Sequence, residues 1–170
     1  MSKVPYFPTP YEIVKRMLKL ANVKPGEVVY DLGAGDGRIV IEAAKNFGAR
    51  GVAIELHPRR VEKIRENLRL NDVKRMVDVI KGDFYKVRVG NADVVTLYLL
   101  TGTNAGLRPK LECELKPGSR VVAHDFPVPG WIPKKVISVK FKDGIHKVYL
   151  YESPFRKVGL LDTMTDALNV

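Results

Sequence analysis

The sequence predicts an α/β fold in which a mostly parallel, doubly wound sheet is covered by helices on both faces. Three observations indicate this class. Apolar strand-like runs alternate with helix-like segments, a glycine-rich turn follows the first run, and only three residues separate the last two runs. Alternation of this kind favours right-handed crossovers. The short final connection, Lys142-Asp143-Gly144, predicts an antiparallel hairpin at the end of the sheet.

The length and composition of the chain limit the class of protein. Its 170 residues, 45% hydrophobic and 28% charged, suit a single domain over 1–170. No apolar run is long enough to span a membrane, and the N-terminus lacks a signal-like apolar region. Cys113 is the only cysteine, so an internal disulfide is excluded and we expect a cytoplasmic protein. Nothing in the sequence demands a dimer, and we expect a monomer.

The chain is basic, with a formal net charge of +10, which admits an acidic partner such as nucleic acid. The basic residues are spread along the chain rather than clustered, and this favours a solvated surface instead. In the segment 58–70, Glu62 and Glu66 alternate with basic residues, which predicts a salt-bridged outer helix face. These basic residues are Arg59, Arg60, Lys63, Arg65 and Arg69.

The first helix is predicted to begin at Thr9-Pro10 and to end before the Lys24-Pro25-Gly26 turn. Thr9 can cap the helix, and Pro10 suits its first position. Helical spacing places a set of apolar residues on one face: Ile13, Val14, Met17, Leu18 and Ala21.

Seven further segments are predicted to be strands, and several of them are almost entirely apolar. Such runs are typical of parallel strands buried on both faces of a sheet. The predicted strands are 26–32, 51–56, 77–84, 92–100, 120–126, 136–141 and 145–151. Helices are predicted at 36–47, 58–70 and 104–115, whereas the tail 152–170 shows no clear pattern.

The turn after the first strand reads YDLGAGDG and contains Gly33, Gly35 and Gly37. Ligands of open α/β sheets bind at the carboxyl ends of the strands, where glycines allow the backbone to approach them closely. The spacing does not match the dinucleotide fingerprint G-x-G-x-x-G, because Arg38 stands at the third glycine position. The phosphate-binding P-loop pattern is absent too.

Acidic residues stand at the predicted ends of three successive strands: Asp31, Glu55 and Asp83. A carboxylate at Glu55, twenty residues beyond Gly35, can accept hydrogen bonds from both hydroxyls of a ribose. Asp83 can take an adenine amino group, and the neighbouring Phe84 can pack on the ring. Three such acids in register predict a site for an adenosine-containing ligand.

This set of residues resembles the class I S-adenosylmethionine-dependent methyltransferases over roughly residues 26–151. The resemblance implies a Rossmann-like, seven-stranded class I methyltransferase sheet that ends in an antiparallel hairpin. It implies S-adenosylmethionine as the cofactor, which carries no phosphates. The implied contacts from the core are Asp31, Gly33, Ala34, Gly35, Gly37, Glu55, Leu56, Asp83 and Phe84.

Three further stretches resemble the small archaeal protein-lysine methyltransferases: PYFPTP (5–10), LYLLTGTN (97–104) and HDFPVPGW (124–131). That family is related to the mitochondrial ATP synthase c-subunit lysine methyltransferases and distantly to Dot1. The resemblance implies that segment 1–22 covers the cofactor, with Tyr6 and Thr9 in contact with it. It implies protein substrates carrying exposed lysines. The short predicted channel and the lack of a docking domain suggest broad specificity.

Other methyl acceptors are less favoured by the sequence. Methyltransferases that act on base amino groups carry Asp/Asn-Pro-Pro-Tyr/Phe after the fourth strand, and this chain has none. Enzymes that methylate C5 of a pyrimidine need a nucleophilic cysteine, whereas Cys113 lies in a predicted helix and is expected to be buried. An RNA methyltransferase, a small-molecule methyltransferase and a cofactor-binding module without activity remain as alternatives.

The lysine channel is hypothesised to be built from Tyr98, Leu100, Phe126 and Trp131. A narrow apolar channel would lower the pKa of the lysine amine by desolvating its charged form. Thr101 or Asp125 is the candidate contact to the amine, and no residue stands out as a general base. Alternatively, Tyr98 and Leu100 are core residues, and Trp131 only plugs the end of the sheet.

No metal site is predicted from the sequence. The three histidines, His57, His124 and His146, show no spacing typical of metal ligands. His57-Pro58 predicts a helix start, and His124 is interpreted as a polar group at a strand end.

Overall fold

The computed structural model describes residues 6–142 and 144–159 of the chain. The helices in this part are α1 (Tyr11–Leu20), α2 (Arg38–Phe47), α3 (Pro58–Leu70) and α4 (Thr101–Glu114). The strands are β1 (Val28–Leu32), β2 (Arg50–Glu55), β3 (Val77–Lys81), β4 (Val94–Leu97), β5 (Arg120–His124), β6 (Lys135–Phe141) and β7 (Gly144–Glu152). Among the described residues, no helix combines the length and apolar character needed to cross a bilayer.

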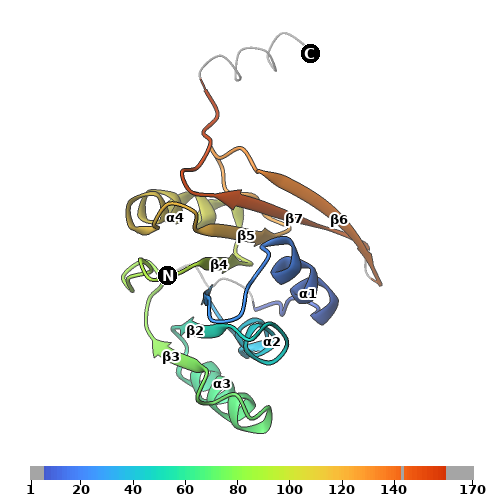
Figure 1. Cartoon of the computed structure of the whole chain (residues 1–170), viewed down its shortest axis with the longest axis vertical. Helices are drawn as coiled ribbons and strands as arrows, with labels where there is room; N and C mark the ends of the chain where they lie inside the picture. Colours follow the sequence, from blue (N-terminus) through green and yellow to red (C-terminus); the bar gives the residue numbers. More distant parts are fainter. Residues whose placement is uncertain (1–5, 143, 160–170) are drawn as a thin grey trace.

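The seven strands form one sheet in the order β3-β2-β1-β4-β5-β7-β6 (Figure 1). The pairs β1–β2, β1–β4, β2–β3 and β4–β5 are parallel. Strand β7 lies antiparallel to both β5 and β6. The predicted fold class, with its terminal hairpin, is therefore confirmed, although Asp143 in the hairpin turn lies outside the described residues.

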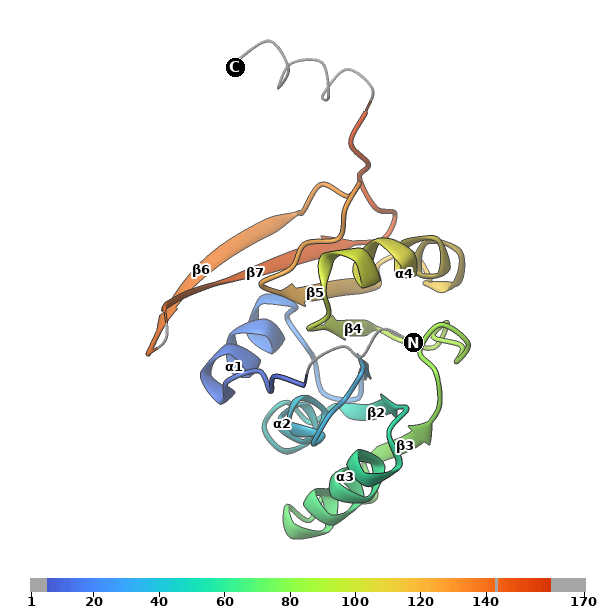
Figure 2. The same cartoon turned by 180° about the vertical axis from the view of Figure 1, so that it is seen from behind.

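Helices cover both faces of the sheet. Leu107 and Leu111 of α4 pack with Leu97 of β4 in one apolar cluster. Met17 of α1 and Val29 of β1 belong to a second cluster on the opposite face, which α2 shares, and α3 extends this layer over β2 and β3. Figures 1 and 2 show α1 and α2 together on one side of the sheet and α4 on the other. Burial on both faces explains why the parallel strands are so apolar.

The start of α1 differs from the prediction. The N-cap residue is Pro10, and no side chain caps the helix. The Thr9 hydroxyl instead lies 3.2 Å from Nδ1 of His124 on β5. The apolar face of α1 is confirmed, since its five predicted residues are fully buried: Ile13, Val14, Met17, Leu18 and Ala21.

Two strands end earlier than predicted at their carboxyl ends. Strand β3 ends at Lys81, where the Gly82 N–H turns to the Glu55 carbonyl, so Asp83 stands two residues beyond the strand. Strand β4 ends at Leu97, and α4 begins three residues earlier than predicted, at Thr101. The expectation of a buried Cys113 is wrong, because Leu107 and Leu111 occupy the buried face of α4 and Cys113 is exposed.

Candidate active site

A cavity of about 1020 Å³ opens where β1, β2 and β4 end. Many of the predicted site residues line it: Tyr6, Thr9, Asp31, Gly33, Ala34, Gly35, Glu55, Leu56, Asp83, Phe84 and Tyr98. A separate cavity of about 310 Å³ beside Arg38 and Asn67 contains none of these residues. The larger cavity is therefore the candidate active site.

The glycine turn forms the floor of this cavity. Gly35 has φ +60°, and a Cβ placed on it would lie 2.5 Å from Cε2 of Tyr6. The aromatic ring of Tyr6 therefore packs directly on the backbone, an approach that only glycine permits. Gly37 is the N-cap residue of α2 and does not line the cavity. It lies one turn behind the floor, under Ile64 of α3.

Residues 6–9 close one side of the cavity. The guanidinium of Arg60 lies 4.4 Å from the centre of the Tyr6 ring, a cation–π contact. Arg38 donates a hydrogen bond of 2.9 Å to the Thr9 carbonyl, and its guanidinium pairs with Asp36. Two arginines, one at the start of α2 and one on α3, thus hold this segment against the glycine turn.

Glu55 is buried at the end of β2, and both of its carboxylate oxygens are fixed by backbone donors. Oε2 accepts the Gly35 N–H at 2.9 Å, and Oε1 accepts the His57 N–H at 3.0 Å. A carboxylate has about four acceptor positions, so each oxygen keeps one for a ligand. The arrangement suits two neighbouring hydroxyls of a ribose.

Asp31 is a second buried carboxylate, at the end of β1. The Thr96 hydroxyl donates to its Oδ1 at 2.8 Å. Burial raises the pKa of the Asp31 carboxyl to about 7, against the opposing effect of the Thr96 hydrogen bond, and the charges of Glu55 and Asp36 add to the rise. A cationic ligand group beside Asp31 would favour its ionised form, which suits the methionine ammonium of the cofactor.

Asp83 and Phe84 line the cavity from the turn that follows β3. Oδ1 of Asp83 accepts the Tyr85 N–H at 2.9 Å, which fixes the carboxylate at the turn. The rings of Phe84 and Tyr85 lie 5.0 Å apart, and the Tyr85 side chain also lines the cavity. This wall offers a hydrogen-bond acceptor beside aromatic surface, as an adenine requires.

The predicted acceptor residues are only partly brought together. Tyr98 lines the cavity, and the Phe126 ring stacks beside it with 6.2 Å between centres. Leu100 and Thr101 are exposed at the start of α4 and do not line the cavity. Asp125 does not line it either, since Oδ2 of Asp125 lies 2.9 Å from Nδ1 of His146.

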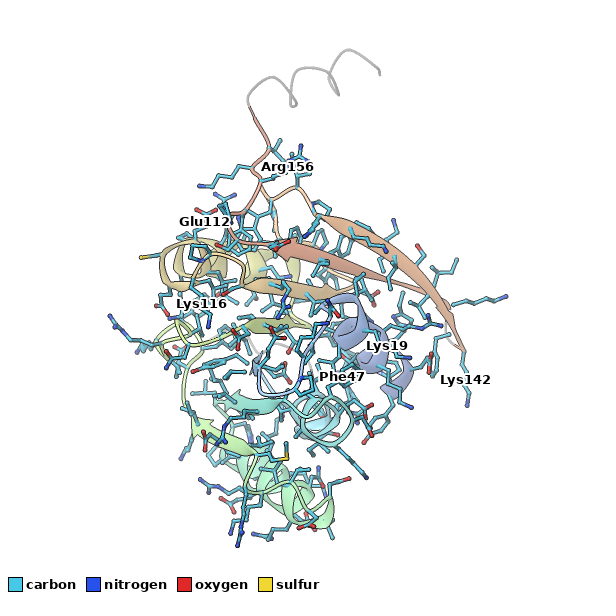
Figure 3. All side chains as sticks on the ribbon, in the orientation of Figure 1. Lys19, Phe47, Glu112, Lys116, Lys142 and Arg156 are labelled. Carbon is cyan, nitrogen blue, oxygen red and sulfur yellow. The ribbon has the colours of Figure 1, made fainter. Side chains whose placement is uncertain are left out.

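Trp131 lies away from the cavity, in contrast to its predicted place in the lysine channel. It is buried in the core, stacks on Phe155 with 3.7 Å between ring centres, and donates from Nε1 to Glu112 on α4 at 2.8 Å. Figure 3 shows Glu112 just below the segment that carries Arg156. This position fits the alternative interpretation of Trp131 as a packing residue at the end of the sheet.

Several residues that line the cavity were not predicted from the sequence: Phe7, Pro8, Asp36, Arg38, Ile39, His57, Pro58, Arg60, Tyr85, Leu99 and Thr103. Arg60 was assigned to a salt-bridged outer face, and the pairs Lys63–Glu66 and Arg65–Glu62 confirm that face for the rest of α3. The first turn of α3 faces the cavity because it follows Glu55 directly. Tyr85 directly follows the predicted pair Asp83-Phe84 in the sequence, and this adjacency could have indicated that it lines the cavity.

Three features define a class I methyltransferase site: the fold, a glycine turn without a phosphate-binding motif, and two buried carboxylates at strand ends. Comparison with known proteins agrees with this class. A family model described as the ANTKMT methyltransferase domain matches residues 31–135. The chain therefore belongs to this family, and S-adenosylmethionine is its cofactor.

Individual relatives match over most of the chain. A protein-lysine N-methyltransferase of Saccharolobus islandicus (strain REY15A) is 48% identical over 87% of this chain and 92% of its own length. The ATP synthase c-subunit lysine N-methyltransferase of Xenopus laevis is 35% identical over 92% of this chain and 67% of its own. A crystal structure of an RNA methyltransferase from Salinibacter ruber, in complex with S-adenosyl-L-homocysteine, is 44% identical with a TM-score of 0.82. It covers 86% of this chain and 93% of the other.

Gly35→Ala is expected to weaken cofactor binding. The added Cβ displaces the Tyr6 ring, and the residue must keep a positive φ. We expect the affinity for S-adenosylmethionine to fall about 10-fold or more, measured by calorimetric titration. Gly118→Ala is the matched control, because Gly118 has φ +85° and a Cβ added there would meet no atom within 4 Å. A control that loses affinity equally would contradict a specific role of Gly35.

Asp31 is expected to make cofactor binding depend on pH. With a pKa of about 7, its carboxylate ionises between pH 6 and 8, and only the ionised form attracts the cofactor cation. Affinity for S-adenosylmethionine should therefore rise about 10-fold over this range. Asp31→Asn should bind weakly without this pH dependence, whereas the exposed Asp78→Asn should keep it. A flat profile in the unmodified protein would rule out this role.

The same carboxyl also affects the stability of the protein without cofactor. The folded state raises the Asp31 pKa from 3.8 to about 7 and so holds a proton more tightly than the unfolded state. The contribution of this group to stability falls as the pH rises from about 4 to about 7 and is constant above.

Proposed function

We propose that the protein transfers the methyl group of S-adenosylmethionine to lysine side-chain amines of proteins. The observation that carries this proposal is an aromatic pair: Tyr98 lines the cavity beyond the end of β4, and the ring of Phe126, beyond the end of β5, stacks beside it. It is supported by the 48% identity to a protein-lysine N-methyltransferase over most of both chains. An aromatic wall suits the aliphatic part of a lysine side chain, which packs along apolar surface.

Methyl transfer requires the protein mainly to position the lysine amine and to favour its neutral form. When bound, S-adenosylmethionine supplies a methyl group already activated on a sulfonium. The chain must align the lysine nitrogen with that methyl and with the sulfur behind it. It must also favour the neutral amine, whose pKa in water is about 10.4. The apolar surface of Tyr98 and Phe126 disfavours the charged form, and the proton passes to water before the neutral nitrogen attacks.

RNA is the second candidate acceptor. The Salinibacter ruber structure, 44% identical, carries the name RNA methyltransferase, and the net charge of +10 suits a polyanion. The basic residues are spread along the sequence rather than clustered, however. Lys19, Lys116, Lys142 and Arg156 lie on separate parts of the molecule in Figure 3. Nucleic-acid sites concentrate such side chains on one face, so protein is the favoured acceptor.

Location, oligomeric state and specificity are also proposals. The single cysteine is in keeping with a reducing cytoplasm. The candidate site is formed within one chain, in keeping with a monomer, and we also propose that the protein does not associate with membranes. The start of α4 is exposed beside the aromatic pair, which favours broad specificity for accessible lysines.

The acceptor can be identified with cofactor that carries a radioactive methyl group. The purified protein is incubated with an extract of its own source, and portions are digested with protease or ribonuclease. We expect protease to release the label and hydrolysis to recover it on methylated lysine. Label released by ribonuclease would overturn the lysine proposal, and no label in either would indicate a module without activity.

Alanine substitution of Tyr98 and of Trp131 should distinguish a residue that contacts the substrate from one that only stabilises the fold. Tyr98→Ala is expected to slow methyl transfer about 100-fold, since loss of alignment by 1 Å has an effect of this size, while the cofactor still binds. Trp131→Ala is expected to lower the free energy of unfolding by about 3–5 kcal/mol and to leave transfer by the folded protein nearly unchanged. Turnover in single-cycle assays and chemical denaturation would measure the two effects. Unchanged turnover in Tyr98→Ala would contradict the channel.

A further inference from the structure

Three side chains with metal-binding atoms meet beside β5 and β7. They are His124, Asp125 and His146, and one ligand atom from each lies within 4.8 Å of the other two. The antiparallel pairing of β5 with β7 brings them together, because the backbones of Asp125 and Lys147 are hydrogen-bonded at 2.8 Å. His146 therefore projects toward the end of β5, although it is distant from His124 in the sequence.

The three atoms contact one another as a closed triangle. Nε2 of His124 lies 2.9 Å from Nδ1 of His146 and 3.2 Å from Oδ2 of Asp125. Nδ1 of His146 lies 2.9 Å from the same oxygen. Since each ring nitrogen carries either one proton or one lone pair, the contacts can be tested against every neutral tautomer.

No arrangement of protons on the two neutral rings satisfies this triangle around an ionised carboxylate. If both nitrogens donate to Asp125, two N–H groups face each other between His124 and His146. If one nitrogen donates to the other, the lone pair of the second faces the carboxylate oxygen. One of the three contacts is therefore repulsive in each case. A cation at the centre removes the conflict, because all three atoms then present lone pairs to it.

The spacing suits a small divalent ion. Zn²⁺ binds nitrogen and carboxylate oxygen at about 2.0–2.2 Å, which places tetrahedral ligand atoms about 3.3–3.5 Å apart. The observed separations of 2.9–3.2 Å need to widen by only a few tenths of an ångström. The side chain of His124 is fully buried, and that of Asp125 is 27% exposed, so an ion has access from the Asp125 side.

The groups around the cluster also match those around metal sites. Metal-binding histidines commonly donate their second ring N–H to an oxygen, and ligating carboxylates are themselves hydrogen-bonded. Nδ1 of His124 lies 3.2 Å from the Thr9 hydroxyl, and Oδ1 of Asp125 accepts the Lys147 N–H at 3.0 Å. These contacts leave Nε2 of His124 and Oδ2 of Asp125 directed at the centre of the cluster.

We propose that His124, Asp125 and His146 form a binding site for one divalent transition-metal ion, with Zn²⁺ as the ion that best fits the ligands. The ion joins the end of β5 to β7. Through His124 it also orients Thr9, which belongs to the segment that closes the cofactor cavity. The site is structural in this arrangement and does not depend on the identity of the methyl acceptor.

The test is zinc binding by the full chain. The purified protein is stripped with a chelator, supplied with excess Zn²⁺, desalted and measured by plasma mass spectrometry. We expect one zinc per chain, and His146→Ala is expected to retain none. His57→Ala is the matched control, because His57 is the third histidine and lies outside the cluster, and it should bind as the unmodified protein does. Asp125→Asn keeps the side-chain shape, and asparagine tolerates its φ of +57°.

Two further measurements test the proposal: the zinc affinity of Asp125→Asn and the thermal unfolding midpoint with and without zinc. Asp125→Asn should weaken zinc binding by more than about 100-fold, since loss of an outer-shell partner alone costs 10- to 100-fold. Zinc should raise the thermal unfolding midpoint of the unmodified protein and not that of His146→Ala. The proposal is overturned if the unmodified protein holds no stoichiometric zinc, or if His146→Ala binds as much as it does. Circular dichroism establishes that each variant is folded.

Discussion

The position of the glycine turn depends on the end of β2. The N–H groups of Gly33 and Ala34 both donate to the Ile54 carbonyl, and the Gly35 N–H donates to the Glu55 side chain. Three successive backbone donors of the turn are thus satisfied by two residues of the neighbouring strand. Because Ala34 and Gly35 are buried, leaving their donors unpaired would be costly. This pairing places the floor of the cavity, the Tyr6 ring above it and the Glu55 carboxylate beside it.

The cofactor side and the acceptor side of the cavity are constructed differently. On the cofactor side, the carboxylates sit at or just beyond the ends of parallel strands, as Asp31 and Glu55 do, so strand order brings them together. On the acceptor side, Tyr98 is combined with residues that follow β5, and the antiparallel β7 fixes their position. A methyltransferase can therefore change its acceptor by altering this second region while the cofactor residues stay in place.

The same difference explains how much the sequence could predict. Strand-end acids, the glycine turn, helix 58–70 and the hairpin follow from local patterns, and these account for the fold and most of the cofactor residues. Arg60 was missed because a helix face gives no sign of which turn meets a cavity. Trp131 was misplaced because its packing partner Phe155 lies in a segment without a pattern. The meeting of His124 with His146 depends on strand register, which sequence spacing does not reveal.

The cover formed by residues 6–9 bears on how many methyl groups one amine can receive. Two hydrogen-bond contacts at Thr9, with Arg38 and with His124, and a cation–π contact from Arg60 hold it, each worth about 1 kcal/mol. Because the free energy that holds this segment closed is small, we expect spent cofactor to leave from this side within each cycle. An amine held at Tyr98, on a different wall, need not dissociate during that exchange. The architecture is thus compatible with processive addition, in which one lysine is methylated repeatedly before the substrate departs.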